Sequence, residues 1–433
     1  MLKHFAKLSS SLKSVLKYPS LEDQQVRFTD AGWPRVCTRT LWDLWSDDMW
    51  VSCDERRDMD SVEPSDEWEE FALFGCHYSL VIADNFSHVS GSAVKHEVQD
   101  LLRDVKPAEV KPNVLSSSFA GNPKGKGLRR YGATIKAGAD EILHHGGHGP
   151  RGRLNTYDLI TRHQASKAPH VNARTIRQLP GDELMCHTIT SLQNGDGLLV
   201  GGRNSPDHAS TSCFLGTDGK WTKVDDLPQG LYRHCASPVE VGMMECRTST
   251  VLIFGGKVGS HQLSDQWLFW QLGRGWKEFE VVGSRPCPRF GACMTLAYGS
   301  KTKGFLTGGI NERGKVITDM WNWELVLNDG ITKVKCVLSP QVSGRLRDRS
   351  FGRFGARLVD SPRGLLLIGG ISGISLIERR NEVLVVNRAK MQIWDDTTAP
   401  VTLVESDVLQ FCIGPTVPRP LLVGFAVEIV DYN

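Results

Sequence analysis

Three histidines stand within five residues of the sequence, in the run HHGGHG. His144, His145 and His148 are residue types that bind zinc or copper through an imidazole nitrogen. The run coincides with a Gly-Gly turn, however, where neighbouring side chains of a strand point to opposite faces. We therefore expect no metal site at these histidines.

Two adjacent arginines, Arg56 and Arg57, form the next candidate site. Guanidinium groups hold carboxylates and phosphates through paired hydrogen bonds, so this pair could clamp an anionic group of a substrate. The alternative is a surface pair of arginines that faces Asp54 and Asp58 on the same segment. The sequence leaves both interpretations open.

Residues 103–128 combine prolines, serines and glycines with lysines, and this composition is typical of a linker. The cations at its end are Lys124 and Lys126, followed directly by Arg129 and Arg130. Such a group could also contact the phosphates of a nucleic acid, with an affinity that depends on salt and not on base sequence. A linker alone and a linker with phosphate contacts both remain possible.

The overall charge excludes a strongly basic nucleic-acid-binding protein. The chain has 51 Lys and Arg against 49 Asp and Glu, a net charge of +2. Its 433 residues, 40% of them hydrophobic, are enough for more than one folded domain. No uninterrupted apolar run is long enough to span a membrane, so we expect no membrane partner.

The cysteines and the N-terminus bear on localisation. Eleven cysteines are an odd number and none forms a C-x-x-C pair, which favours a reducing compartment, so we expect a cytoplasmic protein. The first residues, MLKHFAKLSSSLKSVLKYP, lack acids and could also be a mitochondrial presequence. Their apolar residues fall at helical spacing, which a packed amphipathic helix would explain as well.

The elements that must position these residues follow from a repeated glycine pair. Five Gly-Gly pairs begin at residues 146, 201, 255, 308 and 369, and short apolar strands such as GLLVGG, TVLIFGG and GLLLIGG lead into them. An Arg-x-Gly-Ala element recurs upstream as RRYGA, RFGAC and RFGAR, and Trp221, Trp267, Trp276 and Trp321 stand downstream of the pairs. This pattern resembles the kelch repeat, whose period is about 50 residues. It implies a mainly β fold over residues 129–433.

The resemblance predicts a six-bladed kelch-type β-propeller with an incomplete last blade. Paired glycines would let the backbone turn where a side chain would clash, and the tryptophans would fill the space between blades. The segment RPLLVGF, residues 419–425, reads as the opening strand of one more blade, but no sixth Gly-Gly follows it.

Residues 1–102 read as a separate α/β segment. LEDQQVRFTDAGW predicts a helix that ends at Gly32, four tryptophans between residues 33 and 50 predict a small dense core, and SLVIA predicts a strand. A further helix is expected after an N-cap at Ser65. Its acids at positions 66, 67, 69 and 70 would form a solvated first turn, and Phe71, Phe74 and Tyr78 would form its apolar face.

This segment resembles the C-terminal third of the leucine carboxyl methyltransferase family. The strings MLKHF, YPSLEDQQVRF, ERR and DEWEEF carry the resemblance. It implies that residues 1–102 are the C-terminal remnant of an α/β Rossmann-like methyltransferase domain, joined by the linker 103–128 to the propeller. Fusion to a kelch propeller is similar to the wybutosine-synthesising members of that family.

The resemblance implies an S-adenosylmethionine-dependent carboxyl methyltransferase and methoxycarbonyltransferase that acts on the modified guanosine beside the anticodon of phenylalanine tRNA. Residues 1–100 contain no glycine-rich turn after a strand, which a cofactor site of this class needs. We therefore expect the cofactor motifs upstream of Met1, a truncated chain that is inactive alone, and no catalytic or cofactor-binding residue within it. The alternative is a non-catalytic kelch propeller that recruits a protein partner.

Overall fold

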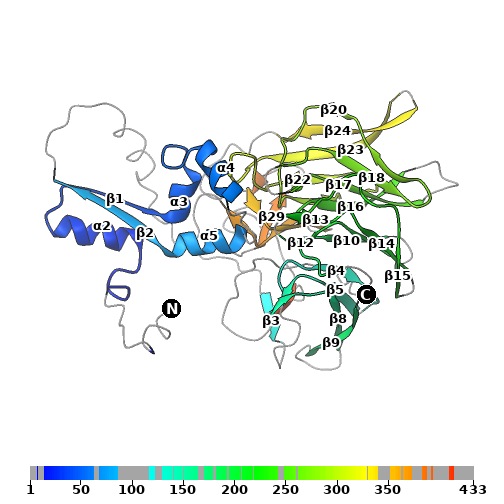
Figure 1. Ribbon diagram of the computed structural model, residues 1–433, viewed down its shortest axis with the longest axis horizontal. Coiled ribbons are helices and arrows are strands. Elements are labelled where there is room, and N and C mark those ends of the chain that lie inside the picture. The colour runs from blue at the N-terminus through cyan, green and yellow to red at the C-terminus, as the bar shows by residue number, and fades with distance from the viewer. Residues whose placement is uncertain are drawn as a thin grey trace. The chain divides into compact units, whose positions relative to one another are not determined.

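The structure of the protein is a computed structural model, and it is mainly β with few helices (Figure 1). It describes Lys7 and residues 14–62, 68–85, 117–121, 129–339 and 352–372, with gaps of one to six residues inside the last two ranges, and strands at 383–387, 392–393 and 409–413. Most of the predicted N-terminal helix lies outside the described residues. No described helix is long and apolar enough to cross a membrane.

The chain divides into two compact units, and the division differs from the predicted boundary at residue 102. One unit comprises residues 1–52 and 71–112, and the other comprises residues 53–70 and 113–433. The segment 53–70 therefore groups with the β-rich part of the chain. The elements before the propeller are α2 (Leu21–Asp30), β1 (Arg35–Thr40), α3 (Leu41–Ser46), α4 (Cys53–Val62), α5 (Trp68–His77) and β2 (Ser79–Asp84).

Local signals place the first elements where the sequence predicts them. Helix α2 begins at a capping box, in which Asp23 N–H donates to the Ser20 hydroxyl and the Asp23 carboxylate accepts from Ser20 N–H, both at 3.0 Å. It ends before Gly32, as predicted, and β1 pairs antiparallel with β2. The predicted tryptophan core is only partly correct, because Trp42 is buried whereas Trp33 and Trp50 are exposed.

The predicted apolar face of α5 is wrong. Phe74 and Tyr78 are exposed, and the buried side chains beyond the first turn are the smaller Ala72 and Cys76. This face carries small residues because the helix approaches α3 closely. A Cβ atom on Gly75 would lie 3.1 Å from the backbone nitrogen of Trp42.

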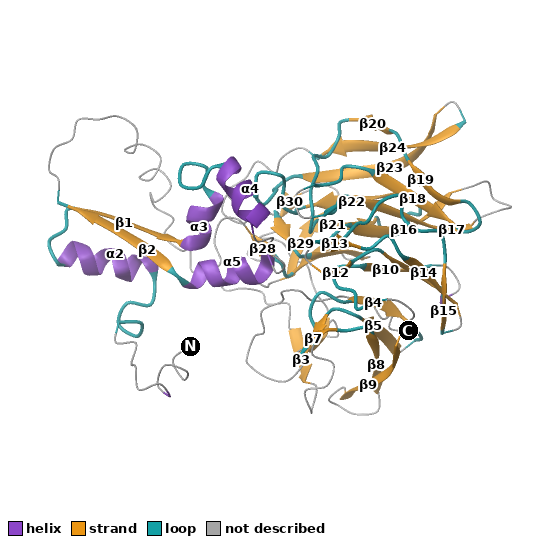
Figure 2. Cartoon of the chain, in the orientation of Figure 1, coloured by secondary structure: helices purple, strands orange, loops and turns teal. Residues whose placement is uncertain are grey.

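The described residues from Ala133 onward include five antiparallel blades, each with four strands in a meander (Figure 2). The first two blades are β4 (Ala133–Lys136), β5 (Glu141–His145), β8 (Thr156–His163) and β9 (His170–Gln178), then β10 (Thr188–Ser191), β11 (Gly197–Val200), β14 (Cys213–Thr217) and β15 (Lys220–Lys223). The third is β16 (Cys235–Val241), β17 (Thr248–Phe254), β18 (Trp267–Gln271) and β19 (Gly275–Glu278).

The fourth and fifth blades repeat this order. They are β21 (Cys293–Leu296), β22 (Lys303–Thr307), β23 (Met320–Asn328) and β24 (Ile331–Leu338), to which β20 (Val281–Gly283) adds a parallel edge, and β26 (Arg357–Ser361), β27 (Gly364–Ile368), β29 (Val383–Asn387) and β30 (Gln392–Ile393). Short pairs lie in the loops of three blades: β6 (His148–Gly149) with β7 (Gly152–Arg153) in the first, β12 (Arg203–Ser205) with β13 (His208–Ala209) in the second, and β25 (Arg353–Phe354) with β28 (Ile371–Ser372) in the fifth. The first strands of successive blades, β4, β10, β16, β21 and β26, contact one another in chain order. This is the arrangement of a β-propeller.

The paired glycines have the role that the sequence predicts. Both members of every pair have positive φ, for example +72° at Gly308 and +91° at Gly309. A Cβ atom on Gly308 would lie 2.0 Å from the carbonyl oxygen of Arg353 in the next blade. Gly309 N–H donates to that same carbonyl at 2.9 Å, so each pair is a joint between neighbouring blades.

Tryptophans pack between the blades, as predicted. Trp267 of the third blade is 1% exposed and lies 4.5 Å from Phe254, ring centre to ring centre. The same buried cluster includes Trp321 and Trp323 of the fourth blade. Burial of such large aromatic surfaces between blades supplies much of the driving force that holds them together.

Residues 103–128, predicted to be a linker, contain one described strand, β3 (Ser117–Gly121). It pairs in parallel with β31 (Leu409–Ile413), in register from Ser117 opposite Leu409 to Gly121 opposite Ile413. This pairing joins a segment before the first blade to one after the fifth. The expected opening strand of the sixth blade, residues 419–425, lies outside the described residues.

Candidate functional site

A ring of backbone hydrogen bonds surrounds the channel between the blades. Its members are the residues just before the innermost strands, Tyr131, Cys186, Arg233, Gly291 and Gly355, and their φ angles run from +56° to +67°. From Cys186 onward, each N–H donates to the carbonyl oxygen of the preceding member, at 2.8 to 2.9 Å. These four bonds link the starts of the five described inner strands to one another.

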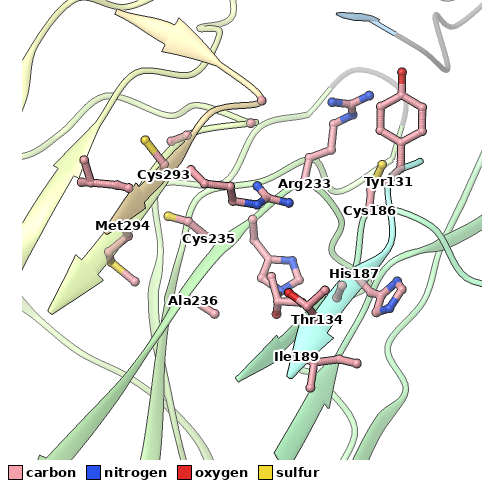
Figure 3. Close-up of a pocket in the computed structure, with 18 of the residues that line it drawn as sticks. Tyr131, Thr134, Cys186, His187, Ile189, Arg233, Cys235, Ala236, Cys293 and Met294 are labelled. Carbon is pink, nitrogen blue, oxygen red and sulfur yellow. The ribbon is translucent and has the colours of Figure 1, made fainter. Parts of the chain in front are cut away.

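A cavity of about 240 Å³ lies inside this ring, lined by residues of β4, β10, β16, β21 and β26. Figure 3 shows how its labelled lining residues divide, with Arg233, Tyr131 and Cys186 at one end, Thr134, His187 and Ile189 on one wall, and Cys235, Cys293 and Met294 on another. The charged groups among the described lining residues are Glu69, Arg233 and Arg357.

Glu69, from the first turn of α5, reaches the cavity and binds Arg233. The two side chains are 2% and 4% exposed, and the guanidinium donates to both carboxylate oxygens at 2.6 and 2.8 Å. Burial alone would raise the pKa of Glu69, but Arg233 holds that pKa below its ordinary value of 4.5. The predicted solvated first turn of α5 is therefore wrong at Glu69, which is ionised and buried.

Other residues of the segment 53–70 also contact the propeller around Glu69. Trp68 packs on Phe290, with ring centres 5.7 Å apart. The buried amine of Lys257 lies 3.5 Å from a carboxylate oxygen of Asp60 and 6.0 Å from the Trp68 ring. Burial lowers the pKa of Lys257, although Asp60 raises it. This segment therefore places an acid and an aromatic ring at the end of the channel.

Arg357 has a different environment from Arg233. Its guanidinium donates a long hydrogen bond, 3.4 Å from Nη1 to the carbonyl oxygen of Ala356. Burial lowers the pKa of both guanidiniums. At Arg233 the carboxylate of Glu69 more than offsets burial, so the pKa is raised; at Arg357 the carboxylate does not offset burial, so the pKa is lowered. Arg357 thus carries a positive charge into the cavity with little compensation.

Four histidines, His144, His145, His187 and His234, gather where the first three blades meet. His145 Nδ1 lies 3.0 Å from His187 Nε2, and the hydroxyl of Thr188 lies 2.8 Å from His234 Nε2. Burial lowers the pKa of His144, His145 and His234 to about 3 and that of His187 well below its ordinary value. All four are neutral at pH 7. Among the described residues, no group of His, Cys, Asp or Glu could hold a metal ion.

The structure describes four of the six predicted arginine and lysine candidates, Arg56, Arg57, Arg129 and Arg130. Arg56 is buried, and exposed Arg57 pairs with Asp54 at 3.0 Å, one of the two acids that the surface interpretation names. Lys124 and Lys126 lie outside the described residues.

Arg129 and Arg130 belong to the first blade. Arg129 is 3% exposed, pairs with Asp158 at 2.7 Å and donates to the carbonyl oxygen of Gly146 at 3.0 Å. Arg130 pairs with Glu70 and is partly exposed. Arg129 therefore stabilises the glycine turn of its own blade and does not present its charge to a phosphate.

The Arg129 contact corrects the predicted repeat register by one residue. Arg289 and Arg353 donate to the carbonyl oxygens of the first glycines of their own blades, at 3.3 and 2.7 Å. Arg129 makes this bond in the first blade, so it is Arg129 and not Arg130 that matches them. The RRYGA string misled because Tyr131, not Gly132, occupies the ring position with positive φ.

Sequence reasoning missed Glu69, Arg233 and Arg357 as site residues. Glu69 looked like an ordinary acid at a helix start, and its partner stands 164 residues away in the chain. A usable signal existed at Arg233, because the fourth and fifth blades have glycine, Gly291 and Gly355, at this repeat position. A bulky residue there calls for a specific contact.

Five antiparallel blades around a channel define the chain as a β-propeller protein, and comparison with known proteins refines this. Residues 181–431 match the family model described as "tRNA wybutosine-synthesizing protein 4, beta-propeller". The chain belongs to this family.

Curated relatives named tRNA wybutosine-synthesizing protein 4 agree with this assignment. The protein from Aspergillus fumigatus is 36% identical over 89% of this chain and 36% of its own length, and that from Emericella nidulans is 35% identical over 100% of this chain and 40% of its own. Among solved structures, "Structure of YjhT" aligns with a TM-score of 0.43 and 13% identity, over 61% of this chain and 83% of that one. The chain thus spans less than half the length of these two curated relatives.

Proposed function

We propose that this chain is part of an enzyme of wybutosine biosynthesis that modifies phenylalanine tRNA with S-adenosylmethionine as methyl donor. The observation that carries the proposal is the match of residues 181–431 to the propeller family of tRNA wybutosine-synthesizing protein 4, supported by 34% identity over the whole chain to the relative from Aspergillus oryzae. The accepting carboxylate of such a substrate is already an anionic nucleophile. The enzyme therefore has to align it with the methyl group and exclude water, without a strong base.

The described residues of this chain do not fit the cofactor. S-Adenosylmethionine sites of this class use a strand followed by a glycine-rich turn and a helix. Among the described residues of the segment 1–102, the strands are the antiparallel pair β1 and β2, and β1 runs into α3 through Thr40 without a glycine. We propose that this chain alone neither binds the cofactor nor transfers a methyl group.

In this proposal the propeller side of the enzyme holds the tRNA. Lys124 and Lys126 remain candidates for phosphate contacts, together with partly exposed Arg130. Each contact of this kind adds about one unit to the slope of log affinity against log salt concentration. Base sequence would matter little to these contacts.

The test is titration of phenylalanine tRNA into the full chain at two salt concentrations, with S-adenosylmethionine titrated in parallel. We expect tRNA binding that weakens with salt, and a slope that falls by up to about two units in the Lys124→Gln/Lys126→Gln variant. The exposed Arg57→Gln variant is the matched control and should keep the wild-type slope. Absence of tRNA binding would favour a propeller that binds protein partners, and micromolar S-adenosylmethionine binding would refute the inactivity of this chain.

A further inference from the structure

We propose that the propeller channel contains a binding site for a small oxyanion, a carboxylate or a phosphate, centred on the guanidinium of Arg357. The proposal is independent of the tRNA-modifying function. It rests on the cavity beside the ring, on the charges that line it, and on the neutral histidines that line it with them.

The charges of the described lining residues do not cancel. Glu69 is the carboxylate among them, and Arg233 already binds both of its oxygens, at 2.6 and 2.8 Å. Arg357 adds a second guanidinium to the same cavity, and it donates a long hydrogen bond, 3.4 Å, to the carbonyl oxygen of Ala356. A partly enclosed guanidinium gains charge-assisted hydrogen bonds when an anion binds beside it.

Neutral donors stand beside this charge. His187 and His234 both line the cavity, and the Nδ1 atom of each is buried without a hydrogen-bond partner. The Nε2 atoms face His145 and Thr188, which can donate to them. Each Nδ1 would then carry the proton. Two neutral imidazoles beside a guanidinium form a polar, cationic lining suited to oxyanions.

The size of the cavity limits the ligand. At about 240 Å³ it is smaller than the roughly 300–1,000 Å³ of pockets that enclose drug-sized ligands. It therefore fits inorganic phosphate or a short carboxylate, and excludes an enclosed nucleotide. Guanidinium groups bind either oxyanion through two parallel hydrogen bonds.

The experiment measures binding of inorganic phosphate and of acetate to the full chain by calorimetry and by thermal shift, against chloride at matched ionic strength. We expect phosphate or acetate to bind with a stoichiometry of one per chain and to raise the unfolding temperature above that in chloride. The comparison of phosphate with acetate decides which oxyanion chemistry the site prefers. Equal effects of phosphate, acetate and chloride would overturn the proposal.

Variants test the position of the site. Arg357→Met should weaken binding by at least about tenfold, because a charged hydrogen-bond donor is lost. Arg274→Met removes an exposed arginine from a turn of the third blade and should leave the dissociation constant unchanged. Equal loss in both variants, or none in Arg357→Met, would refute the assignment.

A variant that should strengthen anion binding keeps the test decisive if Arg357→Met does not fold. Glu69→Gln removes the negative charge that neutralises Arg233, so the cavity becomes more positive and the same anion should bind several-fold more tightly than to the wild type. A dissociation constant in Glu69→Gln equal to or weaker than that of the wild type would contradict a cationic site in the channel.

Discussion

The ion pair between Glu69 and Arg233 leads to a quantitative prediction for stability. Glu69→Gln keeps the size of the side chain but removes its charge, and the variant leaves a guanidinium that is 4% exposed without a counterion. Breaking one partner of such a buried pair costs about 3–5 kcal/mol. The adjoining cavity can admit water to Arg233, so we expect about 3 kcal/mol. The midpoint of urea unfolding, followed by tryptophan fluorescence, measures this loss.

The neighbouring residue supplies the control. Glu70 pairs with Arg130 on the same turn of α5, but their side chains are 35% and 44% exposed. Glu70→Gln should therefore cost at most about 1 kcal/mol. A double replacement of Glu69 and Arg233 by leucine and methionine should recover most of the loss, because no charge is left buried. If Glu69→Gln costs no more than Glu70→Gln, the pair does not hold segment 53–70 on the propeller.

The pH dependence of this ion pair has a definite sign. Arg233 holds the pKa of Glu69 below its ordinary value of 4.5, so the unfolded chain binds a proton at this carboxyl before the folded chain does. The stabilisation is therefore complete well above pH 4.5 and is lost as the pH falls through the lower pKa of the folded state. The stability difference between the wild type and Glu69→Gln should shrink over that same range.

Three further predictions concern the blades. Gly308→Ala should lower the free energy of unfolding in urea by at least about 3 kcal/mol, because the residue has positive φ and its new Cβ would clash with the next blade. Gly219→Ala has a similar φ but open space around it, and should lower the free energy of unfolding by about 1–2 kcal/mol. The pKa of His234 is lowered to about 3 in the folded protein, so below pH 6.5 the unfolded chain binds a proton at this residue and the folded chain does not. The free energy of unfolding should therefore fall as the pH falls. His234→Asn should reduce the slope of that free energy against pH by about 1.4 kcal/mol per pH unit near pH 5. Arg129→Met should cost about 3–5 kcal/mol in the same assay and Arg57→Met at most about 1 kcal/mol, and equal costs would contradict the structural role of Arg129.

The repeated features of the propeller could be predicted because they depend on local chemistry. Glycine pairs require positive φ, apolar strands require burial on both faces, and tryptophans such as Trp267 fill the gaps between blades. Each of these constraints acts within one blade or between two neighbours, so the sequence displays it at a regular period.

The channel site could not be predicted from the sequence, because its residues come from distant parts of the chain. Glu69 lies among four acids at a helix start, and nothing local separates it from Glu70. Only the fold shows that one carboxylate is 2% exposed beside Arg233 and that the other is at the surface. The register error at Arg129 has a related cause, since the residue with positive φ in the first blade is a tyrosine.

The backbone conformation at the ring positions bears on the pairing of Arg233 with Glu69. Two members of the ring, Gly291 and Gly355, adopt positive φ without steric cost, whereas Tyr131 and Arg233 pay about 1–2 kcal/mol each for the same backbone. Their side chains offset that cost together, because the Arg233 guanidinium lies 5.4 Å from the centre of the Tyr131 ring while it binds Glu69. Arg233→Gly should therefore relieve backbone strain and still destabilise the protein, because it leaves Glu69 buried and ionised. A gain in stability for that variant would show that the ring, and not the ion pair, determines the residue at this position.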